Sequence, residues 1–309
     1  RFFIAAERYR EAKEALQATI DDFPEEVDLL PQLAALTKRQ AEQLLAEAKD
    51  RADAGQYQLA RGILQGFPLQ AVSRITKIQV EDALRELNEP VKKSNDLMQK
   101  LREQVSKLPA NQQTSLGEIL NEMEAGLSTD TLPRLSDYER LGEVGNIPVD
   151  NRIALAVAGW ILGAGSGEQN LSIAISLIQV RDLVAEYLST ADVARRKAIL
   201  GELSNLEGSE AEYVDRILPL LTPVLPWPED SQHPQIPGMF SVSTDSFQYV
   251  IQLPPEYNPL REYPCVVALH ESRSPVENQL DWWSGAYREQ LEGRMGYGSR
   301  SGFIVVAPV

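Results

Sequence analysis

The hydrophobic pattern changes once along the chain, near residue 237. Up to residue 222, apolar residues recur at intervals of three and four, which is typical of amphipathic helices. From residue 238 to residue 309 they alternate or form short continuous runs, which is typical of strands. Five prolines with acidic and polar neighbours lie between, over residues 223–237, and predict an extended linker. The sequence thus predicts a helical part followed by a sheet-containing part.

A short sequence pattern occurs twice within residues 1–70. Segments starting at Tyr9 and at Tyr57 both read Tyr-x-x-Ala-x-x-x-Leu and both end at Phe-Pro. Tyr, Ala and Leu at these offsets share one helix face, and the small Ala allows a neighbouring helix to approach closely. Residues 31–54 predict a long helix between the copies, which Gly55 ends. The pattern resembles tetratricopeptide-type hairpins, with an ordinary stack of helical hairpins as the alternative.

Residues 71–222 predict a further α-helical bundle. Residues 153–162 are apolar nearly all round, so their helix should be central in it. Gly163, Gly165 and Gly167 then predict a helix stop and a loop, because a phosphate loop would follow a strand and usually contain a Lys. Ser209 with Glu212 predicts a capping box at the start of the last helix.

The part after the linker predicts strands at residues 239–243, 247–253, 265–269 and 303–307. The last two are continuous apolar runs, so we expect both faces of each to be buried. A helix predicted over residues 276–291 joins them, which makes a βαβ unit with a parallel strand pair. We expect residues 238–309 to be poorly stable unless they pack on the helices or on another copy.

Three segments of this part resemble the start of the α/β-hydrolase fold, near its esterase, depolymerase and prolyl-peptidase branches. Tyr249-Val-Ile-Gln-Leu-Pro-Pro-Glu-Tyr257 is similar to the family pattern Y-x-V-x-x-P-x-x-Y. Tyr263-Pro-Cys-Val-Val-Ala-Leu-His270 is similar to its Y-P strand that ends in His-Gly, and residues 302–308 to its next strand. The resemblance implies a fold of the α + α/β class: helical, tetratricopeptide-like repeats, then the N-terminal part of a hydrolase sheet.

The resemblance also implies an oxyanion loop at His270, Glu271 and Ser272. In such hydrolases this loop donates a backbone N–H to the substrate oxygen as its charge develops, here from Glu271 or Ser272, while His270 holds the loop. Glu271 stands where the family has Gly, and its carboxylate would oppose that charge. Trp282 and Trp283 are candidates for a substrate entrance, although at helical spacing only one can face the core.

The sequence contains no Gly-x-Ser-x-Gly elbow, and its two histidines do not complete a Ser-His-Asp set. His233 falls in the linker and is interpreted as a solvated residue. The resemblance therefore implies a serine hydrolase, an esterase or peptidase, whose nucleophile follows Val309, so that this chain alone is inactive. Its helices would dock a protein partner or shape substrate access. One alternative is a non-catalytic helical scaffold with a degenerate hydrolase domain. In another, the helices alone are the functional unit.

Charge and composition restrict the classes of ligand and partner that the chain can bind. A net charge of −15 argues against nucleic acid and anionic membranes, which need a basic surface. The single cysteine, Cys265, excludes an internal disulfide and a cysteine-based zinc site; we find no metal-ligand spacing and expect no cofactor. Residues 153–162 are half the length that a membrane-spanning helix needs, about 20 residues. The chain begins at Arg1 and ends within an apolar run, so we expect both ends to continue, which leaves the compartment open.

Overall fold

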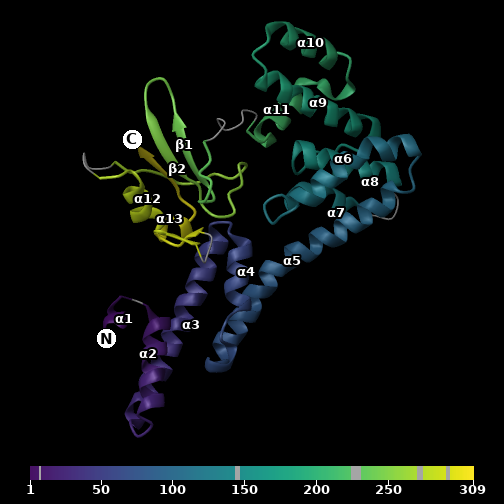
Figure 1. Cartoon of the computed structure of the whole chain (residues 1–309). Helices are drawn as coiled ribbons and strands as arrows, with labels where there is room; N and C mark the ends of the chain where they lie inside the picture. The colour runs from purple at the N-terminus through teal and green to yellow at the C-terminus, as the bar shows by residue number, and fades with distance from the viewer. Residues whose placement is uncertain (7, 143–146, 224–230, 270–273, 290–292) are drawn as a thin grey trace. The chain divides into compact units, whose positions relative to one another are not determined.

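The computed structural model describes the chain except residues 7, 143–146, 224–230, 270–273 and 290–292 (Figure 1). About 64% of the chain is helical, and a small mixed sheet follows the helices. This confirms the predicted order of a helical part and a sheet-containing part. The chain divides into two compact units. Unit 1 comprises Arg1–Leu87, Trp227–Asn258 and Glu262–Val309, and unit 2 comprises Asn88–Pro226 and Pro259–Arg261.

The helices of unit 1 form antiparallel hairpins. They are α1 (Phe2–Ala5), α2 (Tyr9–Asp22), α3 (Leu30–Asp53), α4 (Tyr57–Gln65) and the first half of α5 (Arg74–Val105). The repeated sequence pattern corresponds to a repeated structure, because Tyr9 and Tyr57 each begin a helix and Ala12 and Ala60 are both buried. Gly55 adopts a φ of 77° directly after α3, as expected of a residue that ends a helix.

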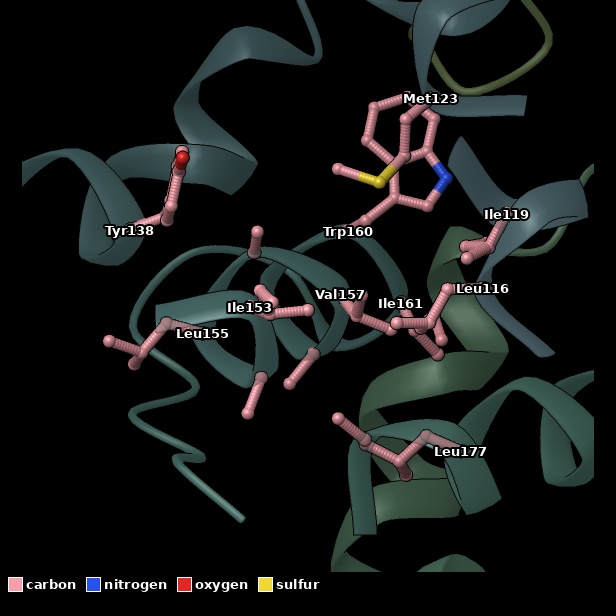
Figure 2. Packing of buried hydrophobic residues seen from close by; sticks show 14 of the residues in the cluster. Leu116, Ile119, Met123, Tyr138, Ile153, Leu155, Val157, Trp160, Ile161 and Leu177 are labelled. Atoms are coloured by element: carbon pink, nitrogen blue, oxygen red, sulfur yellow. The ribbon is translucent and has the colours of Figure 1, made fainter. Parts of the chain in front are cut away.

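Unit 2 is a helical bundle built around one apolar helix. Its helices after α5 are α6 (Ala110–Gly126), α7 (Ser136–Gly142), α8 (Val149–Leu162), α9 (Leu171–Ser189), α10 (Val193–Leu203) and α11 (Ala211–Ile217). Every residue of α8 from Ile153 to Leu162 is buried. Figure 2 shows side chains of α6 and α9, including Met123 and Leu177, gathered around it. The predicted central position of this helix is confirmed.

The glycine loop after α8 is closed by an arginine. Gly163, Gly165 and Gly167 all have positive φ angles, which glycine adopts at little cost. The Arg216 guanidinium donates hydrogen bonds to the carbonyl oxygens of Leu162 (3.1 Å) and Ala164 (3.0 Å). The loop thus presents carbonyl oxygens to a cation, whereas a phosphate loop presents N–H groups to an anion. The predicted stop and loop are confirmed.

The predicted capping box at Ser209 is wrong. Helix α11 begins at Ala211, and the Ser209 hydroxyl donates to the carbonyl of Leu206 (2.7 Å) within a preceding 3-10 turn, Glu207–Ser209. Asp192 does cap α10, because its carboxylate accepts the N–H of Ala194 (2.8 Å). The serine spacing was misleading since a competing local turn satisfies the hydroxyl first.

The sheet of unit 1 has four strands in the order β1-β2-β6-β3. These are β1 (Met239–Ser243), β2 (Gln248–Gln252), β3 (Cys265–Val267) and β6 (Ile304–Pro308). β2 pairs antiparallel with β1 and with β6, while β3 and β6 are parallel, as the sequence predicted. Helix α12 (Glu277–Ser284), a short hairpin of β4 (Tyr287–Arg288) and β5 (Gly293–Arg294), and α13 (Tyr297–Arg300) connect β3 to β6.

The helix predicted over residues 276–291 is shorter than expected. It ends at Ser284 because Gly285 has a φ of 85° and packs closely against Gly296, where the backbone leaves no space for a Cβ atom. The N–H of Gly296 donates to the carbonyl of Ser284 (2.7 Å). This contact turns the chain into the β4–β5 hairpin instead of a further helical turn.

The expectation that β3 is buried on both faces is wrong. Val266 and Ala268 pack into a cluster with Val305 of β6 and Leu280 of α12, but the alternate residues face outward. Val267 is 61% exposed and Leu269 is 77% exposed. Helix α12 covers one face of the sheet, and no described strand pairs with the outer edge of β3.

Buried polar contacts attach the tip of the α3–α4 hairpin to the sheet region of unit 1. Arg51 is 1% exposed, and its guanidinium donates to Glu47 (3.0 Å), to Gln56 (2.7 Å) and to the sulfur of Met295 (3.1 Å). Gln56, also buried, donates to the carbonyl of Ser299 (2.5 Å). Because a buried polar group without a partner costs about 1–3 kcal/mol, these contacts hold the two segments together. Residues 238–309 therefore pack on helices, which is one of the two expected supports.

Glu256 caps α4 from a loop that lies 198 positions away in the sequence. Its carboxylate oxygens accept the N–H groups of Gln58 (3.0 Å) and Leu59 (2.8 Å), in the first turn of the helix. The φ of Glu256 is 54°, a region that residues other than glycine rarely adopt. The negative charge at the helix N-terminus is stabilising, and we infer that it offsets this backbone strain.

Replacing Glu256 with Gln should weaken this cap. The variant keeps the strained backbone and loses the charge, so we expect local opening at the start of α4 to become easier by about 1–2 kcal/mol. Hydrogen exchange of the Gln58 and Leu59 amides should accelerate about tenfold. Glu262→Gln, at an exposed position of the same unit, is the control and should leave both rates unchanged. Equal rates in the two variants would contradict the capping role.

Two glycines in unit 2 helices should respond oppositely to alanine. A Cβ atom at Gly159 of α8 would collide with the backbone oxygen of Arg134, whereas one at Gly117 of α6 meets nothing within 4 Å. We expect Gly159→Ala to destabilise unit 2 by about 1–3 kcal/mol through overpacking, and Gly117→Ala to stabilise it by about 0.5–1 kcal/mol through helix propensity. Hydrogen exchange of α8 measured by mass spectrometry checks both signs.

Candidate functional site

The carboxyl ends of the parallel strands β3 and β6 mark the candidate site. Ligands of α/β sheets bind outside this edge, because the loops that leave the strands converge there. The loop that leaves β3 contains His270, Glu271 and Ser272, the three residues of the expected oxyanion loop. These residues lie outside the described part of the chain. The residues that flank them on both sides, the anchors of the loop, are described.

Both anchors are held by hydrogen bonds. Before the loop, the N–H of Ala268 donates to the carbonyl of Val306 (2.8 Å), which extends the β3–β6 ladder. After it, the Ser274 hydroxyl accepts from the Asn278 side chain (3.1 Å), and the Pro275 carbonyl accepts the N–H of Asn278 (3.1 Å). The residues on either side of the undescribed segment are thus fixed, on one side to the sheet and on the other to the first turn of α12.

A hollow of 590 Å³ lies beside these anchors. Strands β1 and β2, the start of α12 and Val309 line it, with hydroxyl groups from Ser243 and Ser274 and the carboxylate of Glu277 among the polar groups. These groups supply hydrogen bonds and a negative charge. Among the described residues, they do not assemble a nucleophile with a base, since the lining contains no histidine, cysteine or lysine.

The two tryptophans of α12 face different environments. Trp283 packs against the cluster that contains Leu280 and Val305, whereas Trp282 is 81% exposed. This agrees with the expectation that only one of them can face the core. Neither residue lines the 590 Å³ hollow. A role at a substrate entrance stays a prediction for both.

His233 organises the turn that leads into β1. Its Nδ1 atom accepts hydrogen bonds from the backbone N–H groups of Gln235 (3.2 Å) and Ile236 (3.1 Å), and the backbone N–H of His233 donates to the carbonyl of Met239 (2.8 Å). An imidazole nitrogen that accepts two backbone hydrogen bonds acts as a local cap. The interpretation of His233 as merely solvated was therefore incomplete, because sequence alone does not show which N–H groups a side chain can reach.

Sequence analysis missed a buried polar network at the opposite, amino end of β6. Arg294 is 4% exposed; its Nε donates to the Gln252 side-chain oxygen (3.0 Å), and its Nη1 donates to the Gly285 carbonyl (2.7 Å) and pairs with Asp281. Gln252 in turn donates to the carbonyl of Leu253 (3.0 Å). A signal existed, because Gln252 occupies an inward position of an alternating strand where an apolar residue is usual.

Among the described residues, no group of three or more His, Cys, Asp or Glu side chains is arranged to hold a metal ion. No described helix is both long and apolar enough to cross a membrane. Cys265 is free and exposed at the start of β3.

Comparisons with known proteins give no counterpart: no family model, no curated protein and no solved structure matches this chain. The function therefore has to be argued from its own residues and geometry.

The exposed apolar edge of β3 should promote self-association. An unpaired edge with apolar side chains is a template for pairing with another chain. We expect Val267→Lys to reduce oligomers of the 309-residue protein in analytical ultracentrifugation while changing its stability by less than about 0.5 kcal/mol, because the side chain is exposed. Val266→Lys is the contrasting variant, since Val266 packs against the core and its replacement should destabilise the sheet. Unchanged oligomers in Val267→Lys would contradict this prediction.

Proposed function

We propose that the protein is a serine hydrolase, an esterase or peptidase, to which this chain contributes the helical region and the first strands of the catalytic domain. The loop of residues 270–273 would supply the oxyanion hole. The nucleophilic serine and its histidine would come from residues that follow Val309.

The strand order is the observation that carries this proposal. In the α/β-hydrolase fold, the first two strands of this region pair antiparallel. The third strand lies one position away from the second, and the fourth returns through a crossover to lie between the second and the third. Here β6 lies between β2 and β3, pairs antiparallel with β2 and runs parallel to β3. The three sequence segments that resemble the family include β2, β3 and β6, in the same order along the chain.

The face of the sheet opposite α12 also supports the proposal. Ile251, Val306 and Val267 are in register on β2, β6 and β3, and they form an apolar row on the face opposite α12. Parallel sheets bury both faces, so further helices are expected to cover this row. A further strand of the same domain would pair with β3, and the elbow at its carboxyl end would stand beside the loop of residues 270–273.

In the proposed reaction, the serine hydroxyl attacks an ester or amide carbonyl while the histidine accepts its proton. The carbonyl oxygen gains negative charge, and backbone N–H groups of Glu271 or Ser272 hold it. The nearby Glu271 carboxylate would raise the energy of that oxyanion. This residue favours the second candidate function, a helical scaffold whose hydrolase domain binds without turnover.

A fluorophosphonate probe tests the proposal on the full-length protein, because it labels only an activated serine. We expect labelling at a single serine within a Gly-x-Ser-x-Gly segment after Val309, and loss of labelling when that serine is replaced by Ala. The 309-residue chain alone should stay unlabelled. Absence of labelling in a folded full-length protein would favour the scaffold.

The role of Glu271 has its own test. If its carboxylate opposes the oxyanion, Glu271→Gly should accelerate labelling about tenfold, equivalent to about 1.4 kcal/mol of barrier. Glu262→Gln, at an exposed position outside the 590 Å³ hollow, is the control and should change the rate much less. A slower rate in Glu271→Gly would instead show that the Glu271 side chain supports the site.

A further inference from the structure

A second hollow, of 290 Å³, lies at the other edge of the sheet. Gln252, which lines it, pairs with Val305 near the start of β6, whereas the candidate catalytic edge lies at the end of that strand. The hollow is therefore separate from the site proposed for hydrolysis, and the inference drawn from it does not depend on that function.

The walls of this hollow are mainly apolar. Phe240, Leu253 and Pro254 are buried residues that line it, and the ring of Tyr257 adds to them. Arg294 also lines the hollow, although it is 4% exposed. Glu256 is the second charged residue of the lining, and its carboxylate faces the N-terminus of α4. A small, mainly apolar cavity with a few fixed polar groups is the usual form of a site for a small molecule, and this volume is near the lower end of the range for such sites, about 300 Å³.

The hydrogen-bond donors and acceptors around the hollow are almost all engaged. The Gln252 amide accepts from Arg294 Nε and donates to the carbonyls of Pro237 and Leu253. The Glu256 carboxylate binds the N-terminus of α4. Arg294 Nη1 binds Asp281 and Gly285. Arg294 Nη2 has no partner among the described residues, so its two N–H groups can donate to a ligand.

We propose that this hollow binds a small monocarboxylate with an apolar body. A guanidinium group matches the planar oxygens of a carboxylate, and the body of the ligand would lie against Phe240, Leu253 and Pro254. Asp281 pairs with Arg294 from the other side of the guanidinium and is 44% exposed. This pairing neutralises part of the positive charge, which favours a singly charged carboxylate over a phosphate dianion.

NMR titration of the 309-residue protein tests the proposal with two compounds of nearly equal shape, phenylacetate and phenylacetamide. We expect phenylacetate to shift the amides of Gly238, Leu253 and Gly293 saturably, with an affinity at least tenfold higher than that of phenylacetamide. Arg294→Lys should weaken phenylacetate at least tenfold. Arg288→Lys, an exposed position of the same hairpin, should not change the affinity.

A second variant decides the matter if Arg294→Lys does not fold. Leu253→Phe fills the hollow from its apolar side and leaves the backbone contacts of Leu253 and the pairing of Arg294 intact. It should weaken phenylacetate at least tenfold while the spectrum stays that of a folded protein. Equal affinities for acid and amide, or unchanged affinity in Leu253→Phe, would overturn the proposal.

Discussion

Unit 1 depends on one buried polar interface, at the tip of the α3–α4 hairpin. Arg51 and Gln56 are buried there. Gln56 donates a hydrogen bond to the carbonyl of Ser299 in the sheet region, and Glu256 accepts one from the N–H of Gln58 in α4. Apolar contacts tolerate small shifts, but a shift that separates a buried guanidinium from its hydrogen-bond partners is strongly destabilising. This requirement fixes the position of the hairpin tip on the sheet region more narrowly than side-chain packing would.

The sheet attached to this interface is asymmetric. One face packs on α12 and carries the core residues Val305 and Leu280, while the other presents an apolar row that ends at Val267. Two different hollows lie at opposite ends of its strands, one lined by Ser274 and Val309 and one lined by Arg294.

Local patterns predicted the parts of the fold that local chemistry determines. The apolar residues 153–162 revealed the central helix, and two apolar runs joined by a helix revealed the parallel pair β3–β6. The end of α12 at Ser284 was missed because it depends on the contact of Gly285 with Gly296, which no periodicity encodes. The alternation of β2 marks Gln252 as an inward polar residue, but the sequence does not show that Arg294 and the end of α12 come together with it. The oxyanion loop and the tryptophan entrance stay predictions.

The cap on α4 also has a consequence for synthesis on the ribosome. The N-terminal residues of α4 emerge long before Glu256, which is 198 positions further along. At about 5–20 residues per second, the carboxylate follows the helix by roughly 10–40 s. During that interval the hairpin tip is exposed, and Arg51 and Gln56 lack their distant partners. The hairpin tip is thus synthesised well before the residues that complete its contacts, and a chaperone that shields the tip would have that interval in which to act.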